Sequence, residues 1–306
     1  MSVVAAAALE RLTLATRLTG NAAALDQARA YSDAAETIAR YRLSDLVSAT
    51  PGKTTLQGNW LGTPQPLPVP EGSATARVTD GGNCFNLNSV VAGDNEENLK
   101  VRPIGVSQFQ ALMRLLGVED RLARTVAASL ADWIDTDVQP QPGGAEDETY
   151  LGMPTPYRAS NRLMVDASEL RAVHGVTPAL YDVLRPWVCA LPTSALSPIN
   201  VNTLLPGQAP LFAMLLPGKL SIDQARQLLA RRPAEGYGSV NAFWQVPALA
   251  ALSPDMEVSQ QTKITTRWFR VDITVELGGA EVNEIALIDA QEKPARLVRR
   301  QWGEAG

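Results

Sequence analysis

The sequence predicts an α+β fold in which a block of short helices interrupts a helix-and-sheet domain. Residues 3–48 contain no proline, and their apolar positions recur at helical spacing. From Lys263 onward the apolar period changes to two, which is typical of half-buried strands. Between about 104 and 250, loops rich in proline, glycine, serine and asparagine separate short helical segments. These helices are expected at 107–116, 119–134, 167–173, 178–188, 221–231 and 239–246.

The N-terminal helix, read as one element over 3–48, would exceed roughly 60 Å at about 1.5 Å per residue. Gly20 is the one position in it where a break is expected. Residues 2–9 look like the end of an apolar segment, and a methionine directly before them suggests a chain that begins inside or just beyond a membrane helix. The sequence itself has no apolar run of about 18 residues, the length that a spanning helix requires.

Two groups of strands are expected, one on each side of the helical block. After a proline-rich loop over 51–70, the alternation around the turn at 80–83 predicts a hairpin over 74–88. Near the C-terminus, alternation over 269–275 is followed by Gly278-Gly279, a hairpin turn. Further strands are expected at 281–289 and 295–301, which completes an antiparallel meander.

Neither group of strands is large enough to be stable alone, so we expect both to join one sheet covered by the N-terminal helix. This arrangement predicts a discontinuous domain formed by 1–98 and 254–306. The inserted helical domain is then 99–253.

Composition and spacing argue against several functions. The formal net charge of −5 gives no general attraction to nucleic acid or to anionic membranes. His174 is the only histidine, there is no GxSxG elbow, and histidine and cysteine do not occur at zinc spacing. Cys189 lies in an apolar run, where burial is expected in place of nucleophilic chemistry. We therefore expect no catalytic residue and no enzyme.

Two segments resemble helix-hairpin-helix DNA-binding units, which is the main alternative interpretation. One surrounds Gly175 and the other surrounds Gly218. In each, a side chain (Thr177 or Leu220) replaces the second glycine that would let backbone amides approach a phosphate. Residues 99–250 carry 13 basic and 13 acidic side chains, so no basic face is required. We interpret both hairpins as packing scaffolds.

The most distinctive chemical feature is an acidic window. No lysine or arginine occurs between Arg124 and Arg158, so the carboxylates there repel one another unless they bind a cation or stay solvated. Calcium accepts six to eight oxygen ligands in flexible geometry, although the segment does not match the calcium loop of an EF-hand. The residues alone leave a solvated loop and a cation site both open. The acidic residues of the window are Asp132, Asp135, Asp137, Glu146, Asp147 and Glu148.

The two cysteines, Cys84 and Cys189, are similarly ambiguous. In a reducing compartment they would be buried thiols, whereas in an exported protein they could form one disulfide closing a loop of roughly a hundred residues.

An ordered set of local motifs resembles the K family of minor pseudopilins of type II secretion, also called general secretion pathway protein K. The strongest part of this resemblance begins with Asp132-Trp-Ile-Asp-Thr-Asp137 and continues through 144–150 and 157–162, and Cys84-Phe-Asn-Leu-Asn88 resembles the family's hairpin signature. The other matching segments are 25–31, 168–171, 186–192, 199–203, 264–267 and 299–303.

The resemblance implies a pilin-like α+β domain with a large all-α insertion, anchored in the bacterial inner membrane by an N-terminal segment that this chain lacks and otherwise periplasmic. It implies assembly with the I and J minor pseudopilins at the pseudopilus tip, with the H pseudopilin as a further candidate partner, and no nucleic acid. It also implies bound calcium in the acidic loop. The expected ligands are Asp135, Asp137, Glu146 and Asp147, followed by Asp132 and Asn161. The oxidising compartment then predicts a Cys84–Cys189 disulfide that ties the hairpin to the insertion.

Overall fold

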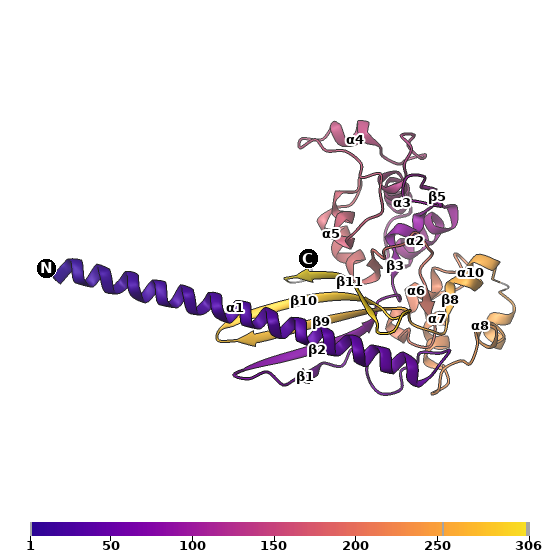
Figure 1. Cartoon of the computed structure of the whole chain (residues 1–306). Helices are drawn as coiled ribbons and strands as arrows, with labels where there is room; N and C mark the ends of the chain where they lie inside the picture. The colour runs from indigo at the N-terminus through magenta and orange to yellow at the C-terminus, as the bar shows by residue number, and fades with distance from the viewer. Residues whose placement is uncertain (1, 253, 304–306) are drawn as a thin grey trace. The chain divides into compact units, whose positions relative to one another are not determined.

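The computed structural model describes residues 2–252 and 254–303 and divides into two compact units (Figure 1). The first unit contains Met1–Pro51, Gln57–Asp80 and Arg267–Gly306. The second contains Gly52–Leu56 and Gly81–Thr266. The contacts therefore divide the chain near 80 and 266, whereas the sequence placed the boundaries near 98 and 253.

The first unit is a long helix packed on an antiparallel sheet. Helix α1 (Ser2–Ala49) is continuous through Gly20. It buries an alanine-rich stripe that ends at Leu43, and small side chains let the helix lie close to β9 and β10 (Figure 1). Residues 10–23 are exposed throughout, and we call them the stem of α1. Among residues 2–252 and 254–303, no helix combines the length and the apolar character needed to cross a membrane.

The sheet of the first unit has the order β1-β2-β9-β10-β11, with every neighbouring pair antiparallel. Its strands are β1 (Gln65–Leu67), β2 (Gly72–Asp80), β9 (Trp268–Leu277), β10 (Ala280–Asp289) and β11 (Arg296–Trp302). Alternate residues of β9 from Phe269 to Leu277 are buried beneath α1. Gly278 and Gly279 both have positive φ and form the expected β9–β10 turn. The meander and its union with the earlier strand in one sheet are confirmed.

The hairpin predicted over 74–88 is wrong. Strand β2 pairs with β1 and β9, while β3 (Phe85–Asn86) pairs in parallel with β6 (Val188–Cys189) in the second unit. The residues after Asp80 form a turn, but this turn does not select a pairing partner. That partner is decided by burial, because β2 places Ala74 and Ala76 in the core beneath α1.

The second unit is built from short helices and ordered loops around its own apolar core. Its α-helices are α2 (Pro103–Leu115), α3 (Asp120–Ile134), α4 (Asp147–Leu151), α5 (Pro178–Leu184), α6 (Ala209–Ala213), α7 (Ile222–Ala230), α8 (Val240–Trp244), α9 (Pro247–Ala250) and α10 (Met256–Gln261). Its 3₁₀ turns are η1 (Leu87–Val90), η2 (Ala167–Ala172), η3 (Arg185–Trp187) and η4 (Pro206–Gln208). Two further strand pairs join β4 (Val91–Ala92) to β5 (Lys100–Val101) and β7 (Ile199–Asn200) to β8 (Thr262–Lys263).

Buried asparagines satisfy backbone groups where this unit has little regular secondary structure. Asn88 donates to the carbonyls of Met164 and Leu191 at 2.9 Å each and accepts from the Met164 amide at 2.7 Å. Asn86 donates to the carbonyls of Thr193 and Ala195. These side chains replace the ladder bonds that a longer strand would supply.

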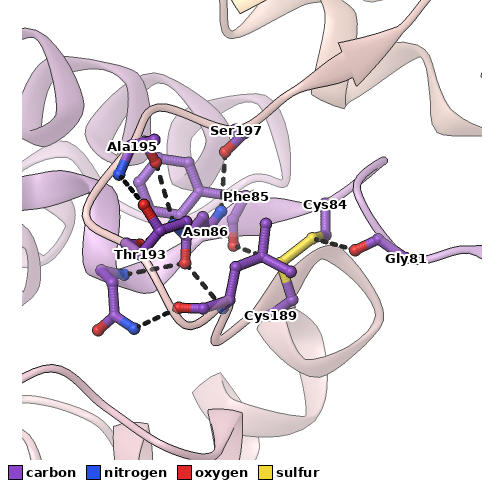
Figure 2. The surroundings of a disulfide bond; sticks show 10 residues. Gly81, Cys84, Phe85, Asn86, Cys189, Thr193, Ala195 and Ser197 are labelled. Carbon is purple, nitrogen blue, oxygen red and sulfur yellow. Dashed lines mark hydrogen bonds between the residues drawn. A yellow bond between two sulfur atoms is a disulfide. The ribbon is translucent and has the colours of Figure 1, made fainter. Parts of the chain in front are cut away.

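Cys84 and Cys189 form a disulfide beside β3 and β6, with Cα atoms 5.8 Å apart (Figure 2). The predicted disulfide is confirmed. It lies within the second unit, because the segment that leaves β2 enters that unit before Cys84. Figure 2 shows Asn86 next to the bridge, with its backbone amide donating to Ser197 Oγ at 2.8 Å.

Candidate metal centre

Two helix ends in the second unit bring acidic side chains together. Helix α3 ends at Ile134, and Asp135 is its C-cap residue in extended conformation. Glu146 is the N-cap residue of α4. The loop between them returns the chain so that one carboxylate oxygen from each of Asp135, Asp137 and Glu146 lies within 4.8 Å of the others. We call these three residues the carboxylate cluster.

The buried oxygens of this cluster have unmet hydrogen-bonding capacity. Asp135 is fully buried and Glu146 is 6% exposed. Among the residues that the structure describes, both Asp135 oxygens and Glu146 Oε1 accept no hydrogen bond. Asn161 Oδ1 is likewise buried without a hydrogen-bond partner in the described chain. The backbone amide of Asn161 donates to the carbonyl of Trp133, which lies two residues before Asp135 in the sequence. Buried acceptors of this kind ordinarily have a partner, and hard oxygen donors suit a divalent cation.

The raised pKa values of Asp135 and Glu146 agree with the clustering of their carboxylates. Burial, together with the negative charges of Asp137, Asp132 and Glu146, raises the pKa of Asp135 to about 7. Burial and the neighbouring carboxylates also raise the pKa of Glu146 to about 7. Holding these groups ionised without a counter-charge is therefore unfavourable, and a bound cation would remove that penalty.

Asp132 holds the loop through hydrogen bonds to its backbone. Its carboxylate is fully buried and accepts from the backbone amides of Gln141 at 3.0 Å and Ala145 at 2.8 Å, which fixes the course of the loop. Gly144 passes so close that an added Cβ would lie 1.9 Å from Asp132 Oδ2, so this position requires glycine. Burial raises the pKa of Asp132 to about 6 even though these amides favour its ionised form.

Asp147 also finds protein partners. It forms an ion pair with Arg158 and accepts from the Ala159 amide at 3.0 Å. Arg158 is the first basic residue after the acidic window. Its position in the sequence is the one feature from which the ion pair with Asp147 could have been predicted. The structure thus brings Asp135, Asp137 and Glu146 together, while Asp132, Asp147 and also Asp137, which accepts from the Gln139 amide at 2.8 Å, have hydrogen-bond partners within the protein.

An aromatic cluster lies in the same region. Trp133 is in edge contact with Tyr150 at 5.2 Å between ring centroids, and Tyr150 lies 5.3 Å from Tyr157. Burial raises the pKa of Tyr150 well above its usual value. Trp133 is two residues from Asp135, so its fluorescence is a natural reporter of changes in the carboxylate cluster.

The helical hairpins that suggested DNA binding have packing partners. Gly175 has φ +85°, and a Cβ added there would lie 3.1 Å from Val126 Cγ2 on α3. Thr177 caps α5 by accepting from the Leu180 amide, and Leu220 is buried. Both side chains that replace the second glycine are therefore used in local structure.

The raised pKa values give a prediction for the metal-free protein. A carboxyl whose folded pKa exceeds its unfolded value contributes stability below the unfolded pKa and loses it as pH rises through the folded pKa, here about 7 for Asp135 and Glu146. We expect the metal-free chain to melt at a lower temperature at pH 8 than at pH 5.5. Asp135→Asn should reduce this pH dependence, and the exposed control Glu148→Gln should leave it unchanged. Equal pH dependence in wild type and D135N would contradict the assignment.

A long helix on an antiparallel sheet, combined with a helical unit that carries an acidic loop, defines a pilin-like protein with a large inserted unit. The models of the family "Type II secretion system (T2SS), protein K" match residues 83–193 and 199–267. The chain belongs to this family. This confirms the resemblance carried by the sequence motifs.

Relatives and a solved structure agree over nearly the whole chain. The type II secretion system protein K of Pectobacterium carotovorum subsp. carotovorum is 34% identical over 99% of this chain and 92% of its own length. The protein K of Klebsiella pneumoniae is 36% identical over the same shares. A chain in the crystal structure of the GspK-GspI-GspJ complex from enterotoxigenic Escherichia coli aligns with a TM-score of 0.79 and 30% identity, covering 92% of this chain and 97% of that one.

Proposed function

We propose that the protein is a minor pseudopilin that assembles with the I and J pseudopilins at the tip of the type II secretion pseudopilus. Membership of the protein K family supports the role, and the similar solved chain belongs to a complex that contains GspI and GspJ. The single structural observation that carries the proposal is the stem of α1, because it exposes large apolar side chains along a helix that no described part of the chain covers.

The stem has the properties of a helix that is completed by partners. Leu12, Leu14 and Leu18 are 64%, 59% and 60% exposed. The 14 residues of the stem (10–23) extend over about 21 Å, and an isolated helix of this length is marginal in water. Burial of its leucines against partner helices would stabilise both, and this is how extended helices commonly recognise one another.

The proposal assigns the second unit a structural function. As the larger part of the chain it would prevent further subunits from stacking, which leaves this subunit at the filament end. The bulk of the chain would lie in the periplasm, with inner-membrane anchoring on the N-terminal side of α1. The Cys84–Cys189 disulfide supports an oxidising location. No catalytic role is proposed, and with Cys189 in the disulfide a thiol nucleophile is not available there.

We also propose that calcium binds the carboxylate cluster and stabilises the loop between α3 and α4. Asp135, Asp137 and Glu146 would supply the charged ligands, and Asn161 Oδ1 is the best-supported neutral candidate. Calcium suits the set better than magnesium, which demands a tighter octahedral shell and sheds its waters reluctantly. When bound, the ion supplies charge compensation and not chemistry.

The partner proposal is tested on the stem. Replacing Leu12, Leu14 and Leu18 together by alanine should weaken binding to a purified I–J pair by at least about tenfold, because each 1.4 kcal/mol of lost apolar burial corresponds to one factor of ten. Calorimetry or interferometry would measure the affinity, and circular dichroism would verify the fold. The matched control replaces the same leucines by methionine, which should retain most of the affinity. Unchanged binding by the alanine variant would exclude the stem as the interface.

A further inference from the structure

A buried ionic network lies in the first unit between α1 and the last two strands. Glu36 on α1 and Glu284 on β10 are each 1% exposed, and Ser32, one turn before Glu36, is fully buried. Arg300 on β11 forms ion pairs with both glutamates. These groups belong to the first unit, whereas the carboxylate cluster belongs to the second, and the proposed assembly function does not use them.

The two glutamates compete for one guanidinium. Arg300 donates to Glu36 Oε2 from Nε at 2.9 Å and from a terminal nitrogen at 2.5 Å. Glu284 Oε2 accepts the Ser32 hydroxyl at 2.5 Å. Glu284 Oε1 lies 3.3 Å from Arg300 Nε, but it accepts no hydrogen bond within the described chain because that N–H is directed at Glu36.

Within the described chain, ion pairs link Glu284 through Arg300 and Glu36 to further charged groups. Helix α1 contributes Asp33, which pairs with Arg300, and Arg40, which pairs with Glu36 at 3.8 Å. On β9 the residue opposite Glu284 is Ile273, which brings no charge. With all groups ionised, three carboxylates (Asp33, Glu36, Glu284) face two guanidiniums (Arg40, Arg300). One proton on Glu284 makes the numbers of positive and negative charges equal.

We propose that Glu284 is protonated in the folded protein and donates a hydrogen bond from Oε1 to Glu36, so that the contact of α1 with the sheet depends on a shared proton. A proton on Oε1 turns the one Glu284 oxygen that has no hydrogen bond in the described chain into a donor, and a carboxylate oxygen of Glu36 is the acceptor. It also removes the repulsion between two buried carboxylates that lie beside the same Arg300 nitrogen. The pKa of Glu284 is raised, first by burial and further by Glu36, which agrees with this assignment.

The sign of the pH effect follows from linkage. Because its folded pKa is raised above the unfolded value, Glu284 contributes stability at low pH and loses that contribution as pH rises through the folded pKa. The packing of α1 on β10 and β11 should therefore loosen at alkaline pH. Glutamine at this position would resemble the protonated carboxyl, since its amide can donate to Glu36 at every pH.

The test compares Glu284→Gln with wild type in the full chain under saturating calcium, so that the carboxylate cluster titrates equally in both. We expect E284Q to melt about 2–4 °C higher than wild type at pH 8 and to match it at pH 5. Glu284→Ala should melt lower at both pH values because it loses the Ser32 and Glu36 contacts. The exposed control Glu281→Gln on the same strand should follow wild type.

A direct readout does not depend on stability. In selectively carboxyl-labelled protein, the NMR carbon signal that disappears in E284Q should have the shift of a protonated carboxyl at pH 7. An ionised shift for that carbon between pH 5 and 8 would overturn the proposal. So would a melting temperature of E284Q below wild type that falls further as pH rises, because that result would show that Arg300 requires the charge of Glu284.

Discussion

Replacing both cysteines by serine should destabilise the second unit by about 4–5 kcal/mol, the largest effect expected of any change considered. The bridge joins residues 105 positions apart, so its loss restores a large amount of conformational freedom to the unfolded chain. Total stabilities of single domains are about 5–15 kcal/mol. The variant is therefore expected to be partly unfolded at 37 °C.

Denaturant unfolding followed by circular dichroism would measure this loss, with wild type in reducing buffer as a second estimate. The matched control replaces Cys84 and Cys189 together by alanine. The serine and alanine double variants both lack the disulfide and differ only in side-chain polarity, so comparing them separates the effect of the covalent link from the effect of polarity. We expect the two variants to lose similar stability. A loss below about 1 kcal/mol in both would show that the asparagine-held loops order this region without the covalent link.

Calcium removal should produce the second largest effect. At a hundredfold excess over its dissociation constant, a ligand that binds only the folded state adds about 2.7 kcal/mol, so chelation should lower the melting temperature by several degrees. Magnesium should restore less than calcium, because it requires a tighter octahedral shell. Trp133 fluorescence should report the same titration.

Asp135→Asn is the sharpest variant for this test because Asp135 is buried with both oxygens lacking hydrogen-bond partners in the described chain. It should abolish most of the calcium response while the fold is retained. Glu148→Gln, an exposed acidic neighbour outside the carboxylate cluster, should respond like wild type. If chelation leaves wild type unmoved and purified protein contains no metal, the acidic loop is solvated and the calcium proposal fails.

The periodic parts of the chain could be predicted from sequence because their pattern and their burial have the same origin. The alternation of β9 and β10 places one face of these strands in the core of the first unit, whereas α1 buries mainly alanines and leaves Leu12, Leu14 and Leu18 exposed. The hairpin over 74–88 failed because local turn chemistry carries no information about a partner strand almost two hundred residues away. The helix α4 was missed because five residues show too little of the helical period.

The candidate site was likewise predictable from the sequence only in part. The charge pattern located the acidic loop, and the structure gathers Asp135, Asp137 and Glu146 within it. The pattern could not distinguish the carboxylates that gather in one cluster from those that mainly hold the loop. Asp132 accepts loop amides and Asp147 pairs with Arg158, and both outcomes depend on how the loop folds back. Sequence spacing alone does not specify that path.

The discontinuous sheet of the first unit also sets an order of folding. Strand β2 is complete at Asp80, but its neighbour β9 begins only at Trp268, after the whole second unit has been made. At about 5–20 residues per second, the 188 residues from Asp80 to Trp268 (268 minus 80) take about 9–38 s to synthesise. During that time the second unit can close around its disulfide, whereas α1 has no sheet to cover its alanine stripe. The nascent protein therefore has an interval in which a chaperone that binds apolar helices would have its greatest effect on yield.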